Sequence, residues 1–98
     1  MDLDTFRRLM QECHRKTRFY STQHWILVNT SFLEIKKEGK DILPFVIDCL
    51  REKDCQFVHI CFALLWEITQ VNPIKEENSG YVSKMRDDWL EWAIVNGY

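Results

Sequence analysis

The chain has 98 residues, of which 46% are hydrophobic and 29% charged, and its formal net charge is -2. This length suits a single domain with one modest core, and the low content of glycine and proline argues against disorder and against a turn-rich β fold. The longest nearly uncharged run, residues 55–66, is shorter than the ~20 residues that cross a membrane. The first residues also lack the apolar run of a signal peptide. We therefore expect one compact all-α domain of about five helices over residues 1–98, located in the cytoplasm.

Residues 1–20 predict a basic amphipathic helix. Asp2 or Asp4 is suited to cap its start, and its end is expected near Phe19 or Tyr20. Apolar residues recur largely at steps of three and four, which places them on one helix face. This stripe consists of Phe6, Leu9, Met10, Cys13 and Tyr20, whereas the remaining surface carries Arg7, Arg8, Arg15, Lys16 and Arg18.

Two short elements are expected next. The apolar residues 25–28 predict a short turn of helix. Thr30 or Ser31 is then placed to cap a second helix, and Gly39 is placed to end it, because glycine readily adopts the left-handed conformation that follows many helices.

A third helix is predicted from Asp41 to about Arg51. Asp41 is suited to the N-cap, and Pro44 falls in the first turn, where its missing N–H breaks no hydrogen bond of the helix. Its apolar residues occupy more than one face, so we expect it to be covered on two sides. The Lys53-Asp54 pair then predicts a tight connection.

The segment from Cys55 to Ile68 predicts a fourth helix. Almost its whole circumference is apolar, which is typical of a helix at the centre of a core. Asn72 and Pro73 are expected to end it, because the residue before a proline avoids the helical conformation.

A Trp-rich helix is predicted over residues 80–98, after a polar loop over residues 75–80. Val82, Met85, Trp89 and Trp92 recur at helical spacing, and Gly97 closes the segment. The aromatic residue at position 98 suggests that this end is packed against the rest of the domain.

The strongest candidate for a metal site combines Cys49, Cys55, His59 and Cys61. Zinc accepts all four ligand types, and Cys55 and His59 at a spacing of four share a helix face. However, the paired knuckle C-x2-4-C is missing, and Cys61 points roughly 200° around the helix from His59. We therefore expect reduced thiols with no metal and no cofactor, and keep a zinc-binding protein as an alternative.

No pattern in the chain indicates catalysis. Cys13 and His14 are neighbours on a helix and point apart, so they do not form a nucleophile and base pair. Asp87 and Glu91 are expected on a solvated face opposite Trp89. Nucleotide-binding loops and hydrolase motifs are absent from the sequence, so we expect a protein that is not an enzyme.

Two stretches resemble known families. Residues 31–69 resemble a HEAT-type helical hairpin and the helix after it, with a first helix closed by glycine (LEIKKEGK) and a second opening with ILPFVIDCL. The segments FALLWEITQVNPI and MRDDWLEWAIVNGY resemble the C-terminal signature of a family of small uncharacterised bacterial and phage-associated helical proteins. This chain departs from the signature at two positions, where Gln70 and Ala93 replace glycines. This resemblance implies a helical fold, and it supports the fold more than any function, since no catalytic activity is known for the family. The matching residues are Ile68, Thr69, Asn72, Pro73, Trp89, Leu90, Trp92, Gly97 and Tyr98.

The sequence as a whole favours a non-enzymatic protein–protein interaction module, which binds either a protein partner or a second copy of itself. A phage or mobile-element protein that binds a larger host complex fits the size and the charge asymmetry: residues 1–40 hold eight Lys and Arg against five Asp and Glu, and residues 41–98 hold five against ten. The alternative is a nucleic-acid-associated adaptor that uses the basic N-terminal helix. The residues predicted to bind the partner are Arg7, Arg8, Arg15, Arg18, Trp25 and Trp92.

Overall fold

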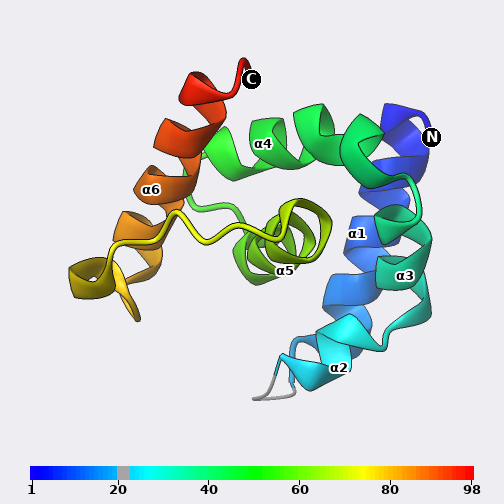
Figure 1. Cartoon of the computed structure of the whole chain (residues 1–98). Coiled ribbons are helices and arrows are strands. Elements are labelled where there is room, and N and C mark those ends of the chain that lie inside the picture. Colours follow the sequence, from blue (N-terminus) through cyan, green and yellow to red (C-terminus); the bar gives the residue numbers. More distant parts are fainter. Residues whose placement is uncertain (20–22) are drawn as a thin grey trace.

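The computed structural model describes residues 1–19 and 23–98 of the chain. Within these residues the protein forms six α-helices and two short 3-10 helices and no strand, which confirms the all-α prediction. None of the described helices has the length and apolar composition that crossing a membrane requires. In chain order (Figure 1) the elements are α1 (Leu3–Thr17), α2 (His24–Leu27), α3 (Thr30–Lys36), η1 (Gly39–Ile42), α4 (Leu43–Arg51), α5 (Val58–Thr69), η2 (Glu76–Asn78) and α6 (Val82–Val95).

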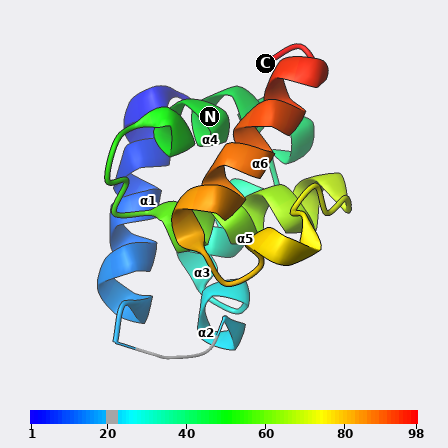
Figure 2. The same ribbon diagram turned by 90° about the vertical axis from the view of Figure 1, so that its left-hand side faces the viewer.

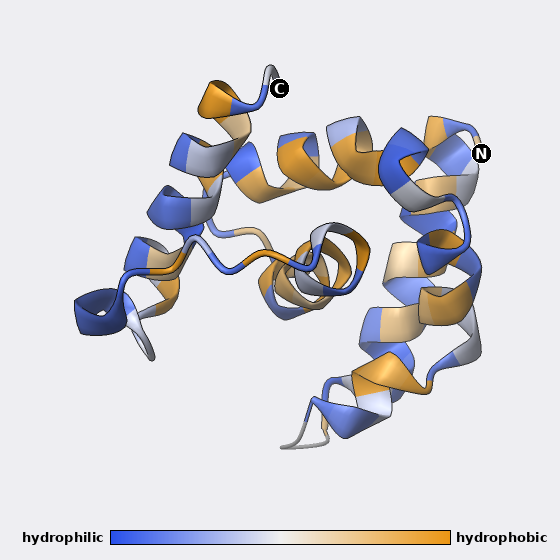
Figure 3. Ribbon diagram, in the orientation of Figure 1, coloured by the Kyte–Doolittle hydropathy of each residue, from blue (hydrophilic) through white to orange (hydrophobic). Residues whose placement is uncertain are grey.

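Helix α5 lies at the centre of the fold. Its residues 60–65 are all buried, and Figure 3 shows hydrophobic residues around much of its circumference. Helix α6 lies on one side of α5 and the α1 and α3 pair on the other (Figure 1), so that α6 is nearest the viewer when the molecule is turned (Figure 2). A helix that is apolar all round has to be covered on several sides. The central position predicted for this segment is therefore confirmed.

Helix α1 begins with the acidic cap that the sequence predicts. Oδ1 of Asp2 accepts a hydrogen bond of 2.7 Å from the backbone N–H of Thr5, which satisfies one of the free N–H groups of the first turn. The helix ends at Thr17, earlier than predicted, and Tyr20 lies outside the described residues. The buried face of α1 consists of Phe6, Leu9, Met10, Cys13 and Thr17.

The cap of α3 is Asn29, so the assignment of this role to Thr30 or Ser31 is wrong. Oδ1 of Asn29 accepts a hydrogen bond of 3.1 Å from the backbone N–H of Phe32, and the backbone of Asn29 is extended, as an N-cap requires. Ser31 is already helical and buried. Its hydroxyl instead donates to Oε2 of Glu12 at 3.1 Å, which ties α3 to α1.

The start of α4 also differs from the prediction. Gly39 adopts a left-handed backbone with φ of 61°, as expected after a helix end, but the chain then continues directly into the 3-10 helix η1. Asp41 lies inside η1, so it does not cap α4, which begins at Leu43 without a side-chain cap. Pro44 does occupy the first turn of α4, as predicted.

The contacts of α3 and α4 do not confirm a HEAT-like hairpin over residues 31–69. The principal partner of α3 is α1, and the principal partner of α4 is α5. Helix α3 leads into α4 through η1, and the two helices run in clearly different directions in Figure 1. The hairpin therefore stays unconfirmed, although the helices themselves are present.

Helix α5 ends at Thr69, before the predicted Asn72-Pro73 stop. Gln70 has a left-handed backbone with φ of 57°. Its side-chain amide donates to the backbone oxygens of Trp66 and Glu67 at 3.3 and 2.9 Å. The carbonyl of Trp66 already accepts the backbone N–H of Gln70, so it is the carbonyl of Glu67 that gains a partner from the side chain.

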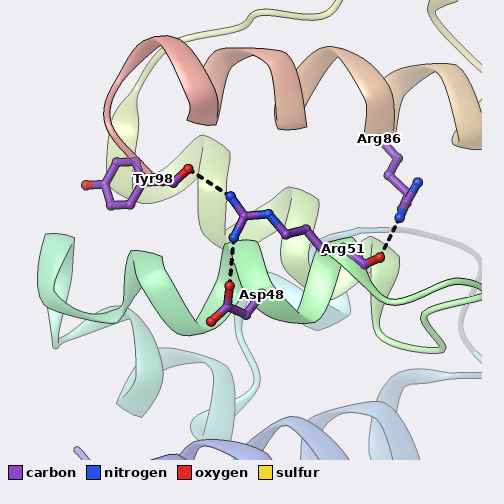
Figure 4. A network of polar contacts seen from close by, with 4 residues as sticks. All are labelled: Asp48, Arg51, Arg86 and Tyr98. Atoms are coloured by element: carbon purple, nitrogen blue, oxygen red, sulfur yellow. Dashed lines mark hydrogen bonds and ion pairs between the residues drawn. The ribbon is translucent and has the colours of Figure 1, made fainter.

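Helix α6 is joined to the end of α4 by two arginines (Figure 4). Nε of Arg86 donates to the backbone oxygen of Leu50 at 2.6 Å. Its Nη2 donates to the backbone oxygen of Arg51 at 2.8 Å, and Figure 4 shows this contact. Arg51 in turn donates to Oδ1 of Asp48 and to the backbone oxygen of Tyr98, both at 2.8 Å. The guanidinium of Arg86 thus caps the C-terminus of α4 from a different helix, where a positive charge is favourable.

Candidate functional site: a basic groove and a three-cysteine cluster

A groove of about 510 Å³ crosses the N-terminal half of α5. Helices α1, α2, α5 and α6 all contribute side chains to it, so it exists only in the folded chain. We call it the basic groove. It is lined by His14, Thr17, Arg18, Gln23, Ile26, Gln56, His59, Ile60, Phe62 and Met85.

The basic groove has an apolar floor and a cationic or polar rim. Ile60 and Phe62 are buried, whereas Arg18 and His59 are exposed, which places the charged and titratable groups toward solvent. The imidazole of His59 meets the ring of Phe62 edge-on at 6.3 Å between centroids. Among the described residues that line the groove, none is acidic. The surface is therefore suited to a ligand that combines negative charge with an apolar group.

An exposed aromatic residue stands beside the groove. Phe19, the second residue after α1, has 84% of its surface exposed, and the guanidinium of Arg18 lies 4.7 Å from the centre of its ring. Trp25 on α2 is 46% exposed and has the imidazole of His24 edge-on at 5.5 Å. Exposed aromatic residues next to a concave surface are typical anchors of protein interfaces.

The structure does not bring the predicted partner-binding residues onto one surface. Arg18 lines the basic groove, and Trp25 lies on the helix that supplies Ile26 to it. Trp92 is only partly exposed and lies elsewhere, on α6, between the rings of Trp89 and Tyr98 at 5.5 and 6.0 Å. It is partly buried against the core and lines a separate cavity with Pro73 and Val95.

The other three predicted arginines are all exposed on α1, but none of them lines the basic groove. Arg8 forms an exposed ion pair of 3.3 Å with Glu12, one turn further along the same helix. Arg7 lines a different cavity of about 200 Å³, next to Cys49. Their role in binding stays a prediction.

Three of the four cysteines meet at the junction of α4 and α5. We call Cys49, Cys55 and Cys61 the cysteine cluster. Their Sγ atoms all lie within 4.8 Å of one another, and those of Cys49 and Cys55 are 3.5 Å apart. His59 is not a member, as expected from its direction relative to Cys61.

The reason for this convergence lies in the loop before α5. Helix α5 begins at Val58, so Cys55 is not on a helix, and the expectation that it shares a helix face with His59 is wrong. Asp54 takes a left-handed backbone with φ of 55°, which turns the chain back after α4. Cys49 comes from the end of α4 and Cys61 from the first turn of α5, with Cys55 between them.

The cysteine cluster favours one anionic sulfur. The pKa of Cys55 is lowered to about 3, first by the neighbouring sulfur of Cys49 at 3.5 Å and then by that of Cys61, with a smaller contribution from the charge of Arg86. The hydrogen bond to Cys55 raises the pKa of Cys49 to about 12. The pKa of Cys61 is raised by its interactions with the sulfurs of Cys49 and Cys55 and then by burial. Cys55 is therefore the first of the three to ionise.

Cys13 is a different kind of thiol. It is fully buried on α1, and this burial raises its pKa to about 11. A nucleophilic cysteine requires the opposite, a thiolate in an accessible and electropositive setting. The geometry therefore agrees with reading Cys13 as a core residue.

Asp88 is a buried carboxylate that the sequence pattern does not reveal. Its Oδ2 accepts hydrogen bonds from the side chain of Asn78 at 2.9 Å and from the backbone N–H of Lys75 at 3.0 Å. These two bonds, in that order, lower the pKa of Asp88. A general acid needs a raised pKa, so Asp88 anchors the loop before α6 rather than supplying a proton.

Sequence reasoning missed the residues that define the groove. His14, His59 and Met85 are far apart in the chain and belong to no motif, so only the packing of α1, α5 and α6 brings them together. For the cysteines the sequence did contain a signal. Cys49 and Cys61 lie on either side of the connection predicted at Lys53-Asp54, and Cys55 lies next to it, six residues from each. Comparison of the chain with protein-family models, with curated proteins and with solved structures found no match.

Proposed function

We propose that this protein is a non-enzymatic interaction module whose basic groove binds an acidic, partly apolar segment of a protein partner. The observation that supports this proposal is the combination of an apolar floor with a rim that carries Arg18, His14 and His59 and, among its described residues, no carboxylate. An acidic side chain of the partner meets positive charge at the rim, while an adjacent apolar side chain is removed from water on the floor.

The size of the groove limits the ligand. A volume of about 510 Å³ holds a few side chains, since pockets for small ligands span ~300–1,000 Å³. A short peptide segment with one or two large apolar residues and flanking Asp or Glu fits this space. Phe19 and Trp25 then extend the contact at the edge, where burial of an aromatic ring stabilises a complex more than burial of a small side chain.

Two finer parts of the proposal come from the family resemblance of the C-terminal segments. The resembling proteins are bacterial and phage-associated, so we propose a partner among the larger complexes of a bacterial cell, in the cytoplasm. The HEAT-like reading of residues 31–69 belongs to the same proposal. The binding site that we propose, however, uses residues of α1, α2, α5 and α6 and does not depend on a HEAT repeat.

The test is a peptide titration followed by NMR. The ¹⁵N-labelled full chain is mixed with an eight-residue peptide of Asp, Glu, Leu and Phe, and separately with a peptide in which Lys replaces each acid. We expect the acidic peptide to shift the amide signals of His14, Arg18, His59 and Met85, and Arg18→Glu to abolish the shifts. Arg8→Glu is the matched control, because Arg8 is exposed on the same helix but does not line the groove.

Nucleic-acid binding gives a different pattern in the same variants. A phosphate backbone along α1 requires Arg7, Arg8 and Arg15, and its affinity falls steeply as salt increases. If a fluorescent oligonucleotide binds and the triple change of these residues to Glu removes the binding, whereas the acidic peptide has no effect on the spectrum, the groove proposal is wrong. The protein is then better described as a nucleic-acid-associated adaptor.

A further inference from the structure

We propose that Cys49, Cys55 and Cys61 form a binding site for a thiophilic divalent metal ion of the zinc class, with the three sulfurs as ligands and a fourth position open to water. The site does not include His59, and it is independent of the basic groove. It rests on the position of the three sulfur atoms in the fold.

The distances fit a single ion. Zinc–sulfur bonds are about 2.3 Å long, so two sulfurs on one tetrahedral ion stand about 3.8 Å apart. The three Sγ atoms lie within 4.8 Å of one another, and the shortest separation, between Cys49 and Cys55, is 3.5 Å. Small rotations of the side chains therefore bring all three to bonding distance without a movement of the helices.

The fold holds these three side chains in place before any ion binds. Cys61 is fully buried on the central helix α5, and Cys49 belongs to α4, which packs directly against α5. Cys55 is held between them by the turn at Asp54. Because the ligands are already gathered, little conformational entropy is lost when the ion binds.

The charge of the surroundings also suits a thiolate-bound ion. Three thiolates and a divalent ion carry a net charge of -1, and each ligand that is still a thiol releases its proton to solvent when the ion binds. Arg86, whose charge acts on Cys55, is fixed nearby by its hydrogen bonds to the backbone oxygens of Leu50 and Arg51. A fixed positive group beside the ligands offsets the negative charge of the complex.

A cavity reaches the cysteine cluster at Cys49. It has a volume of about 200 Å³ and is also lined by Glu52, Arg7 and Phe57. This volume is several times the ~30 Å³ that a water molecule occupies. Cys49 and Cys55 are themselves partly exposed. We therefore place the entry path and the exchangeable fourth ligand on the Cys49 side of the cluster, as expected for a site with three protein ligands.

The experiment uses Co²⁺ as a spectroscopic probe and Zn²⁺ as its competitor. The full chain, reduced with a phosphine, is titrated with Co²⁺, and sulfur-to-cobalt charge-transfer absorption in the near ultraviolet reports thiolate ligands. We expect saturation at one equivalent and loss of the band when Zn²⁺ is added. Cys55→Ala and Cys49→Ala should each lose most of the band, whereas Cys13→Ala, the matched control on α1, and His59→Ala should keep it.

Circular dichroism checks that every variant folds. Cys49 and Cys55 are partly exposed, so their alanine variants provide the test even if a variant of the buried Cys61 does not fold. The proposal is overturned if the wild-type chain shows no charge-transfer band, or if the band survives in both Cys49→Ala and Cys55→Ala. It is also overturned if the reduced chain rejects both ions but forms a Cys49–Cys55 disulfide on mild oxidation, which would identify a redox pair instead.

Discussion

Replacing Arg86 with methionine tests whether one side chain holds α6 to the end of α4. Methionine keeps an unbranched apolar stem of similar reach but removes both hydrogen bonds to the backbone oxygens of Leu50 and Arg51. A hydrogen bond from a charged donor contributes about 1.5–3 kcal/mol, and a carbonyl left without a donor in a partly buried place costs about 1–3 kcal/mol more.

Only the bond to Leu50 is partly buried, whereas the bond to Arg51 is exposed and is weakened by water. The ion pair of Arg86 with Asp87, at 3.7 Å on an exposed surface, adds almost nothing. We therefore expect Arg86→Met to lower the free energy of unfolding by about 2–3 kcal/mol. For a domain of this length that corresponds to a decrease in Tm of roughly 10–20 °C.

The assay is urea unfolding followed by tryptophan fluorescence, to which the buried Trp89 on α6 contributes. The midpoint should fall while the slope stays unchanged, because the same surface is exposed on unfolding. Arg8→Met is the matched control: it removes an exposed ion pair with Glu12, which should cost only about 0.3–0.5 kcal/mol. A loss for Arg86→Met no larger than that of the control would refute the capping role of Arg86.

Two further substitutions test local features of the fold. Asp88→Asn should lower the free energy of unfolding at neutral pH. Because the folded pKa of Asp88 is lowered, the difference in this free energy from wild type should shrink as pH falls below 3.8 and disappear below the folded pKa. Unfolding curves that show the same difference at every pH would contradict this expectation. Gly39→Ala should cost about 1 kcal/mol, since φ of 61° is unfavourable for alanine although nothing lies within 4 Å of the added carbon, and an unchanged urea midpoint would show that the turn adjusts.

Local sequence signals located the helices better than their caps. Asp2, one of the two residues predicted for this role, caps α1, whereas Asp4 lies inside the first turn. At the start of α3 three adjacent polar residues qualify, and the contact of Ser31 with Glu12 on another helix leaves the cap to Asn29. Capping propensities differ little among these residue types, so a single tertiary hydrogen bond is enough to decide between them.

The candidate sites were predictable to different degrees. Cys49, Cys55 and Cys61 were recognised as metal-ligating residue types, but treating Cys55 as part of a helix concealed that its sulfur reaches Cys49. Among the predicted partner residues, Arg18 lines the basic groove, whereas Trp92 packs between Trp89 and Tyr98. Exposure of a tryptophan depends on what covers it, and helical spacing alone does not contain that information.

The sequence by itself determined that this chain is helical and that the apolar segment now seen as α5 lies at its centre, because the spacing of apolar residues records which faces avoid water. Only the tertiary structure decided that three cysteines converge, that Arg86 caps α4 and that His14, His59 and Met85 line one groove. These features join residues from different elements, and their distances depend on how the helices pack and on how the loop at Asp54 turns.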